Sequence, residues 1–187
     1  MKNSSSQKLI FVIIAILVAA VTRLIPHLPN FTPVAAMALF GGVYLKDKKF
    51  AFIVPLVALF LSDILTVLLI NYKYTTLSAF FTSYSALSVY ISFTLVVVLG
   101  MFIQNNVKVG TVAIASFISS TLFFLITNFA VFAASPLIYS QDVSGLMACY
   151  SFALPFYGYG IIGDLFYSAI LFGAFYFTQQ RIPALVK

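Results

Sequence analysis

Residues 109–134 have the sequence VGTVAIASFISSTLFFLITNFAVFAA, which contains no charged side chain. A helix needs about 20 consecutive apolar residues to cross the hydrocarbon layer of a membrane. The apolar run is continuous, whereas the strands of membrane barrels alternate polar and apolar residues. This stretch therefore predicts a transmembrane helix.

Apolar runs of the same kind follow one another along the rest of the chain. With 109–134 they predict an all-α membrane protein, a six-transmembrane-helix bundle that forms one domain over residues 1–187. The other expected helices cover 9–24, 31–45, 50–70, 83–103 and 161–178. The second and the last of these six helices are short for a full crossing. The apolar stretch 146–154 is shorter still, and it predicts a re-entrant or interfacial segment in the last outer loop.

The composition agrees with a protein whose surface faces lipid. Hydrophobic residues make up 63% of the 187 residues and charged residues only 7%, against about 25% charged residues in a soluble domain. The formal net charge is +6, but the basic residues stand at the ends of the apolar runs. This position is typical of topology anchors, not of a patch that binds nucleic acid.

The basic residues also predict the orientation of the bundle, because cytoplasmic loops are enriched in lysine and arginine. With six crossings, one side receives only Arg23 and Lys73. The other side receives Lys2, Lys8, Lys46, Lys48, Lys49, Lys108, Arg181 and Lys187. We therefore expect a multi-pass protein of the inner (cytoplasmic) membrane with both termini in the cytoplasm. Alternatively, the first run ends in a cleavable signal peptide at Val18-Ala19-Ala20, which would leave five helices.

The few polar residues at membrane depth are the candidates for function, since burying them in lipid is costly. Helix rise places most of them in the outer third of the bundle, beneath expected outer loops at 25–33, 71–82 and 135–160. The candidate solute-binding residues are Arg23, His27, Asn30, Asp63, Asn128, Cys149, Tyr150 and Asp164. Because the third loop is rich in tyrosine and phenylalanine, the pattern predicts an outward-facing pocket with an aromatic lid. Alternatively, Arg23 pairs with Asp63 or Asp164 as a structural link, and the aromatic residues form an interfacial belt.

The chain lacks the short motifs of common enzymes. It has no Walker A sequence, no His-Glu-x-x-His zinc motif, no Gly-x-Ser-x-Gly and no glutamate. Its single cysteine, Cys149, excludes an intramolecular disulfide, and no second metal ligand stands near His27 in the sequence. We therefore expect neither enzymatic activity nor a resident metal or cofactor.

Several motifs resemble those of an uncharacterised family of small bacterial transport proteins. They include Arg23-Leu-Ile-Pro-His-Leu-Pro-Asn30, Leu61-Ser-Asp63, Thr127-Asn-Phe129, Leu154-Pro-Phe156 and Gly163-Asp-Leu165. The resemblance covers about residues 19–175. More loosely, the plan is similar to the substrate-binding S components of energy-coupling-factor (ECF) vitamin transporters.

The similarity to S components implies six helices, a substrate site at the outer face, and an energising module of a coupling subunit and two ATPases. It also implies that Ala15 and Ala19, four residues apart, contact the coupling subunit. A subgroup of similar plan handles cobalamin and uses a cysteine near the cobalt. The expected outer position of Cys149 would suit that role.

The leading hypothesis is a substrate-binding subunit of an ECF-like uptake transporter that captures a small vitamin-like or metal-related solute at its outer face. The expected partners are the solute, an ECF coupling subunit with its ATPases, and the lipid bilayer, but no nucleic acid. One alternative is a membrane scaffold without transport activity, in which the polar residues hold helices together. A less supported alternative is an intramembrane enzyme that uses Asp63 or Asp164 as acid or base.

Overall fold

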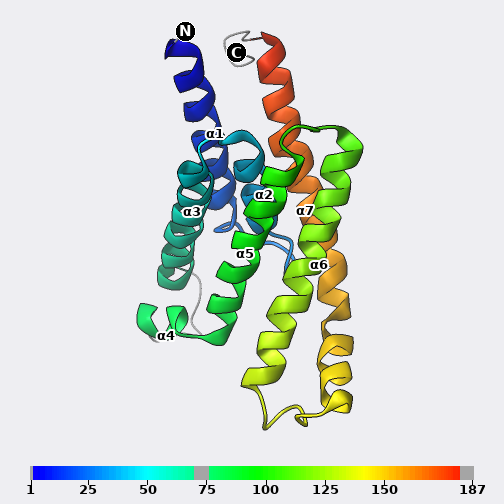
Figure 1. Cartoon of the computed structure of the whole chain (residues 1–187). Coiled ribbons are helices and arrows are strands. Elements are labelled where there is room, and N and C mark those ends of the chain that lie inside the picture. Colours follow the sequence, from blue (N-terminus) through cyan, green and yellow to red (C-terminus); the bar gives the residue numbers. More distant parts are fainter. Residues whose placement is uncertain (1, 70–75, 182–187) are drawn as a thin grey trace.

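The computed structural model describes residues 2–69 and 76–181, and helices are the only regular elements within these ranges. The helices are α1 (Lys2–Thr22), α2 (Val34–Tyr44), α3 (Lys48–Leu69), α4 (Leu77–Phe81), α5 (Tyr84–Ile103), α6 (Val109–Ala134) and α7 (Val143–Arg181). Figure 1 shows one bundle in which the start of α1 and the end of α7 lie at the same end. The predicted all-helical class is thereby confirmed. Lys73 and Lys187, which contributed to the predicted orientation, lie outside the described residues.

Four helices are long and apolar enough to cross a membrane, namely α3, α5, α6 and α7. The apolar part of α1, Ser6–Thr22, is shorter, and α2 has only 11 residues. At 1.5 Å per residue, α2 is about 16 Å long, which is roughly half the thickness of the hydrocarbon layer. The six predicted crossings thus correspond to four full-length helices and two shorter ones.

The short helix α2 forms the centre of the bundle. Every residue from Val34 to Val43 is buried, so the helix is covered on all its faces. Phe40 is fully buried, and its ring centroid lies 4.9 Å from that of Tyr44 and 5.2 Å from that of Phe172. A helix this apolar and this short is stabilised by the helices around it, not by contact with lipid.

α2 and α5 cross at two glycines. A Cβ atom added to Gly42 would lie 2.2 Å from the carbonyl oxygen of Val97, and one added to Gly100 would lie 2.5 Å from that of Leu39. Both obstructing atoms belong to the backbone, so they cannot rotate away. Small residues allow membrane helices to approach this closely, and this crossing has room only for glycine.

The last helix differs most from the prediction. The sequence predicts a helix over 161–178 and a separate re-entrant or interfacial segment over 146–154, but both belong to α7, a single helix of 39 residues. The prediction was wrong because the helix continues through Pro155, Gly158 and Gly160, residues that disfavour a helix in water. In a membrane, a proline inside a helix is tolerated where neighbouring groups satisfy the freed backbone, while an unpaired loop is costly.

Aromatic residues of α7 pack against α6 instead of forming a lid. The ring of Phe124 on α6 stacks on Tyr157 at 4.5 Å and meets Tyr150 edge-on at 5.4 Å. The Tyr150 hydroxyl donates a hydrogen bond to the carbonyl oxygen of Leu125 at 2.7 Å. Because these side chains hold the two helices together, the predicted aromatic lid is absent from the described residues.

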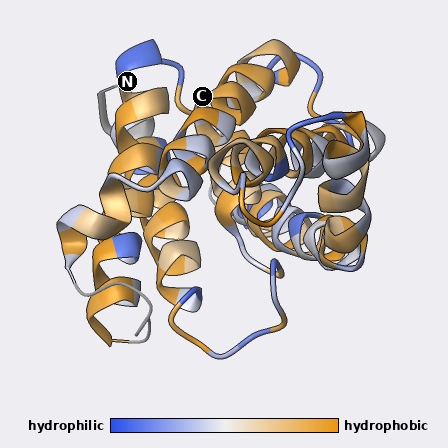
Figure 2. Ribbon diagram, turned by 90° about the horizontal axis from the view of Figure 1, so that it is seen from below, coloured by the Kyte–Doolittle hydropathy of each residue, from blue (hydrophilic) through white to orange (hydrophobic). Residues whose placement is uncertain are grey.

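Hydrophobic side chains cover much of the outside of the bundle. Figure 2 shows hydrophobic colouring along most of the helices, with hydrophilic segments mainly at helix ends and in connections. Many large apolar side chains are exposed, among them Ile53, Val57, Phe102 and Ile114. A surface of this kind is expected where lipid replaces water as the solvent.

Asp142 caps the start of α7 in the connection that follows α6. Its Oδ1 accepts hydrogen bonds from the Gly145 backbone N–H at 2.8 Å and from the Ser140 hydroxyl at 2.9 Å. These hydrogen bonds, first the one from Gly145, hold the pKa of the Asp142 carboxyl below its usual value. The cap is therefore complete above the ordinary aspartate pKa of about 3.9 and is lost as the pH falls through the lowered pKa.

We expect Asp142→Ala to increase amide hydrogen exchange in the first turn of α7 at neutral pH, because the cap is removed. Hydrogen exchange read by mass spectrometry would measure this. The same substitution should have little effect once the pH is low enough to protonate Asp142 in the wild-type protein. An equal difference between the two proteins at both pH values would contradict the assigned cap.

Candidate solute-binding site

A cavity of about 290 Å³ lies where the connection between α1 and α2 meets α5, α6 and α7. Its volume is close to the lower end of the range of ligand pockets, about 300–1,000 Å³. It is lined by Arg23, Asn30, Thr32, Val34, Ala35, Val89, Ser120, Phe123, Phe124, Thr127, Asn128, Gly160 and Asp164. Four of the eight predicted site residues, Arg23, Asn30, Asn128 and Asp164, therefore line one cavity.

Arg23 follows the last residue of α1 and is fixed by α3. Its Nη1 forms an ion pair with Asp63 Oδ1 at 2.7 Å and donates a hydrogen bond to the Ser62 hydroxyl. The second carboxylate oxygen, Asp63 Oδ2, accepts a hydrogen bond from the Tyr90 hydroxyl at 2.8 Å. Of the two pairings considered from the sequence, the structure has Arg23 with Asp63.

The ion pair leaves part of the Arg23 guanidinium available. Both of its contacts use Nη1, so Nε and Nη2 have no partner among the described residues. Asp63 is 3% exposed and does not line the cavity. Asp63 therefore positions Arg23, while the free edge of the guanidinium can bind a planar anionic group.

Asp164 lies near the middle of α7, not at the outer start of a helix as the sequence predicts. It follows Val143 by 21 residues, which corresponds to about 32 Å along the helix. Its side chain is buried, and Asp164 Oδ2 accepts a hydrogen bond from the Ser120 hydroxyl of α6 at 2.5 Å. Within the described residues Asp164 forms no ion pair.

The connection between α1 and α2 is clamped against the middle of α7. The ring of Phe31 lies 5.5 Å from Phe166 and 5.6 Å from Tyr167. A Cβ atom on Gly163 would lie 3.0 Å from Phe31 Cα, so glycine permits the close approach. Asn30 has a positive φ of 62°, a backbone region that asparagine tolerates better than most residues. This bend brings Asn30 and Thr32 to the cavity.

Asn128 completes the polar lining from α6. Its Nδ2 donates to the carbonyl oxygen of Phe124 at 2.8 Å. The Asn128 side-chain oxygen has no hydrogen-bond donor among the described residues and can accept from a ligand.

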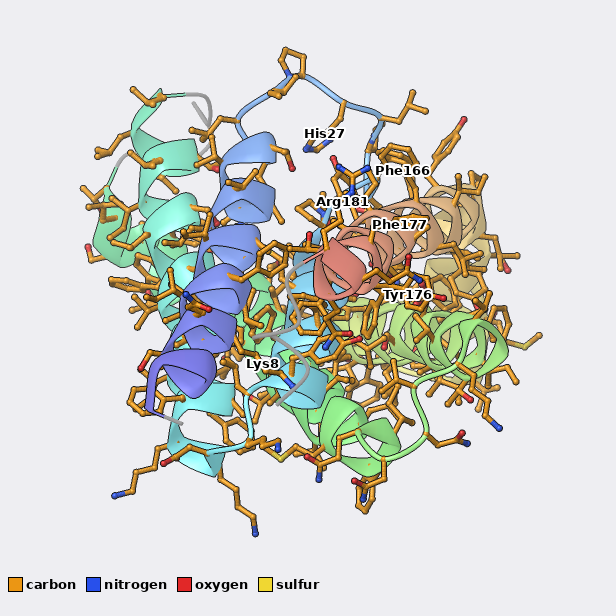
Figure 3. All side chains as sticks on the ribbon, turned by 90° about the horizontal axis from the view of Figure 1, so that it is seen from above. Lys8, His27, Phe166, Tyr176, Phe177 and Arg181 are labelled. Carbon is orange, nitrogen blue, oxygen red and sulfur yellow. The ribbon has the colours of Figure 1, made fainter. Side chains whose placement is uncertain are left out.

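The remaining predicted site residues lie outside the cavity. Figure 3 shows His27 on the loop that follows α1, at the edge of the bundle, and its side chain is exposed. Cys149 is buried, with Sγ 3.5 Å from the carbonyl oxygen of Asn128, and Tyr150 bonds to Leu125. Ala19 is buried in the core and Ala15 packs partly against it, so the Ala15/Ala19 pair faces the interior of the bundle.

Sequence reasoning missed the hydroxyl groups. Ser120 and Thr32 line the cavity, and Ser62 and Tyr90 support Arg23 through α3 and α5. The available signal was the spacing of serines on the expected helix 109–134, where Ser116 and Ser120 fall on one face. The described residues contain no group of three potential metal ligands.

The chain has four helices of membrane-spanning length and a polar cavity inside the bundle. These two features are those of helical membrane proteins with an internal polar site. Within that class, the chain belongs to a family of unknown function (DUF6580), whose sequence model matches residues 3–185. No curated protein matches the chain, and no solved structure matches it. None of these comparisons links the chain to ECF transporters.

Proposed function

We propose that this protein binds a small solute in the cavity and carries it across the membrane. The observation that supports the proposal is the convergence of Arg23, Asn30, Asn128 and Asp164, from three separate segments of the chain, on one cavity inside an apolar bundle. Polar groups at membrane depth are costly and are typical of substrate pathways. The solute would place an anionic group against the free edge of Arg23 and a hydroxyl or amine group near Asp164.

The orientation and the energising partner belong to the same proposal. Lys46, Lys48, Lys49, Lys108 and Arg181 stand at helix ends or in connections at the end of the bundle where α1 begins and α7 ends (Figure 1). Under the positive-inside rule, this end would face the cytoplasm in the inner membrane. An ECF-like coupling subunit with ATPases remains a proposed partner on the strength of the sequence resemblance.

Solute binding can be tested with Asn128→Ala, which leaves the ion pair of Arg23 intact. The wild-type protein, purified in lipid nanodiscs, should retain a small anionic molecule that mass spectrometry identifies. Asn128→Ala should bind this molecule about tenfold more weakly, because one hydrogen bond is lost. Asn106→Ala, in the exposed connection between α5 and α6, is the matched control and should bind as the wild type does.

Two outcomes would count against solute carriage. One is a wild-type protein that retains no small molecule and is stabilised by none of a panel of carboxylates and phosphates. The other is a retained molecule whose affinity is the same in Asn128→Ala and Asn106→Ala. Capture of a partner membrane protein without any small molecule would favour the scaffold hypothesis.

A further inference from the structure

A second cavity is lined by residues of α6 and α7 that lie about one helical turn from Ser120 and Asp164. It has a volume of about 690 Å³ and runs between the first half of α6 and the second half of α7. Ser116 and Ser168 line this second cavity, whereas Ser120 and Asp164 line the first. On each helix the two residues are four positions apart, about 6 Å of rise. The two cavities therefore approach each other within about one helical turn.

Four polar side chains, Ser116, Ser120, Asp164 and Ser168, form a buried seam between α6 and α7 at this point. None of them is more than 7% exposed. The Ser116 hydroxyl donates to the Ser168 hydroxyl at 2.8 Å, and the Ser120 hydroxyl donates to Asp164 Oδ2 at 2.5 Å. The seam links residues that line the first cavity to residues that line the second.

Ser120 has one hydroxyl hydrogen but two acceptors within reach. These are Asp164 Oδ2 at 2.5 Å and the carbonyl oxygen of Ser116 at 3.2 Å. When Asp164 is ionised, Ser120 donates to the carboxylate. When Asp164 is protonated, the carboxyl can donate to Ser120, and the serine hydrogen can turn to Ser116. Asp164 can thus gain or lose a proton without leaving a buried polar atom unsatisfied.

Among the described residues, no cation forms an ion pair with Asp164. Of the described residues that line the cavity, the other charged one is Arg23, which already forms an ion pair with Asp63 on α3. On α5, Tyr90 donates to Asp63. α6 carries no titratable side chain. On α7, Tyr157 is bonded to Thr121, and Tyr167 accepts a bond from Thr22. A proton, or a ligand in the cavity, can therefore balance the charge of Asp164.

We propose that Asp164 and Ser120 form a proton-exchange site that couples solute carriage to protons. The coupling rests on the proposed function, but proton exchange itself needs no solute. A singly charged anion on the free edge of Arg23 would bring negative charge near Asp164 and favour its protonation. One proton then passes from water in the first cavity to Asp164 as the anion binds, and it returns to water when the anion leaves. No bond of the solute changes.

The small number of carboxyl groups makes the site accessible to infrared spectroscopy. The chain has only four carboxyl side chains, those of Asp47, Asp63, Asp142 and Asp164. Difference spectra of solute-free proteoliposomes between acidic and neutral pH should contain a reversible carbonyl stretch of protonated Asp164. This component should disappear in Asp164→Asn and persist in Asp47→Asn and Asp142→Asn. It should shift in frequency in Ser120→Ala, because one hydrogen bond to the carboxyl is lost.

A pH-difference spectrum that is unchanged by Asp164→Asn would overturn the proposal, as would an Asp164 component that Ser120→Ala does not shift. If Asp164→Asn fails to fold, the frequency shift in Ser120→Ala decides alone.

The solute-binding test is independent of the infrared test. Solute retention is measured on the wild-type protein, so it does not depend on any change at Asp164. If the wild type retains a solute but its difference spectra lack the Asp164 component, proton exchange is refuted. An Asp164 component in a wild type that retains no solute refutes solute carriage.

Discussion

Arg23→Ala is expected to lower the free energy of unfolding by about 3–5 kcal/mol, the cost of leaving one partner of a buried ion pair without its counter-charge. Asp63 is 3% exposed and would keep only the hydrogen bond from Tyr90. Equilibrium unfolding in mixed micelles of a mild detergent and SDS would measure the loss. The effect on stability is also why solute binding is better tested at Asn128 than at Arg23.

Two further variants separate the ion pair from the simple loss of a side chain. Arg23→Met combined with Asp63→Leu should regain most of the stability, because replacing both charges by apolar groups removes the unpaired charge. Arg181→Ala, at the exposed end of α7, should change stability by less than about 0.5 kcal/mol. If Arg23→Ala proved as mild as Arg181→Ala, the ion pair would not hold Asp63 in place.

Gly42→Ala and Gly100→Ala are each expected to destabilise the bundle by about 3 kcal/mol, at the upper end of the range for overpacking. The added methyl group would meet the backbone of the facing helix at 2.2 Å in the first case and at 2.5 Å in the second. Neither helix can relieve the contact by rotating a side chain, so α2 and α5 would have to separate. The same unfolding measurement applies.

Gly173→Ala is the matched control for the two crossing glycines. A Cβ atom at Gly173 has no neighbouring atom within 4 Å. Alanine is favoured over glycine in a helix by about 0.5–1 kcal/mol, so this variant should be neutral or slightly more stable. Equal stability changes at Gly42 and Gly173 would show that α2 and α5 do not approach as closely as described.

Periodicity and composition were enough to predict an all-helical fold. They were not enough to predict how far each helix extends through the membrane. The charge-free run 109–134 is α6, because nothing in it competes with a helix. The helix over Val143–Gly160 was missed because proline and glycine break helices in water, whereas packing against α6 sustains one here. The short span of α2 could not be foreseen, since a fully buried helix and a membrane-crossing helix are equally apolar.

The candidate site was predicted in part for a similar reason. Distance along each helix places Arg23, Asn128 and Asp164 at comparable depths, but it does not say which faces of separate helices meet. The choice of Asp63 over Asp164 as the partner of Arg23 depends on that packing. The role of Ser120 depends on it as well, because a serine inside a membrane helix ordinarily bonds to its own backbone.

The long pair of helices α6 and α7 has a practical consequence for imaging. With 39 residues, α7 is about 58 Å long, which exceeds the roughly 40–45 Å thickness of a membrane with its headgroups, even at an average tilt of about 20°. Figure 1 shows the hairpin of α6 and α7 extending beyond α3 and α5 at the end away from the start of α1. Leu137 and Ile138 at its tip are exposed. An epitope grafted at 136–140 would give a rigid attachment point for an antibody fragment, and that added mass would allow particle alignment of a 20.5 kDa protein in electron cryomicroscopy.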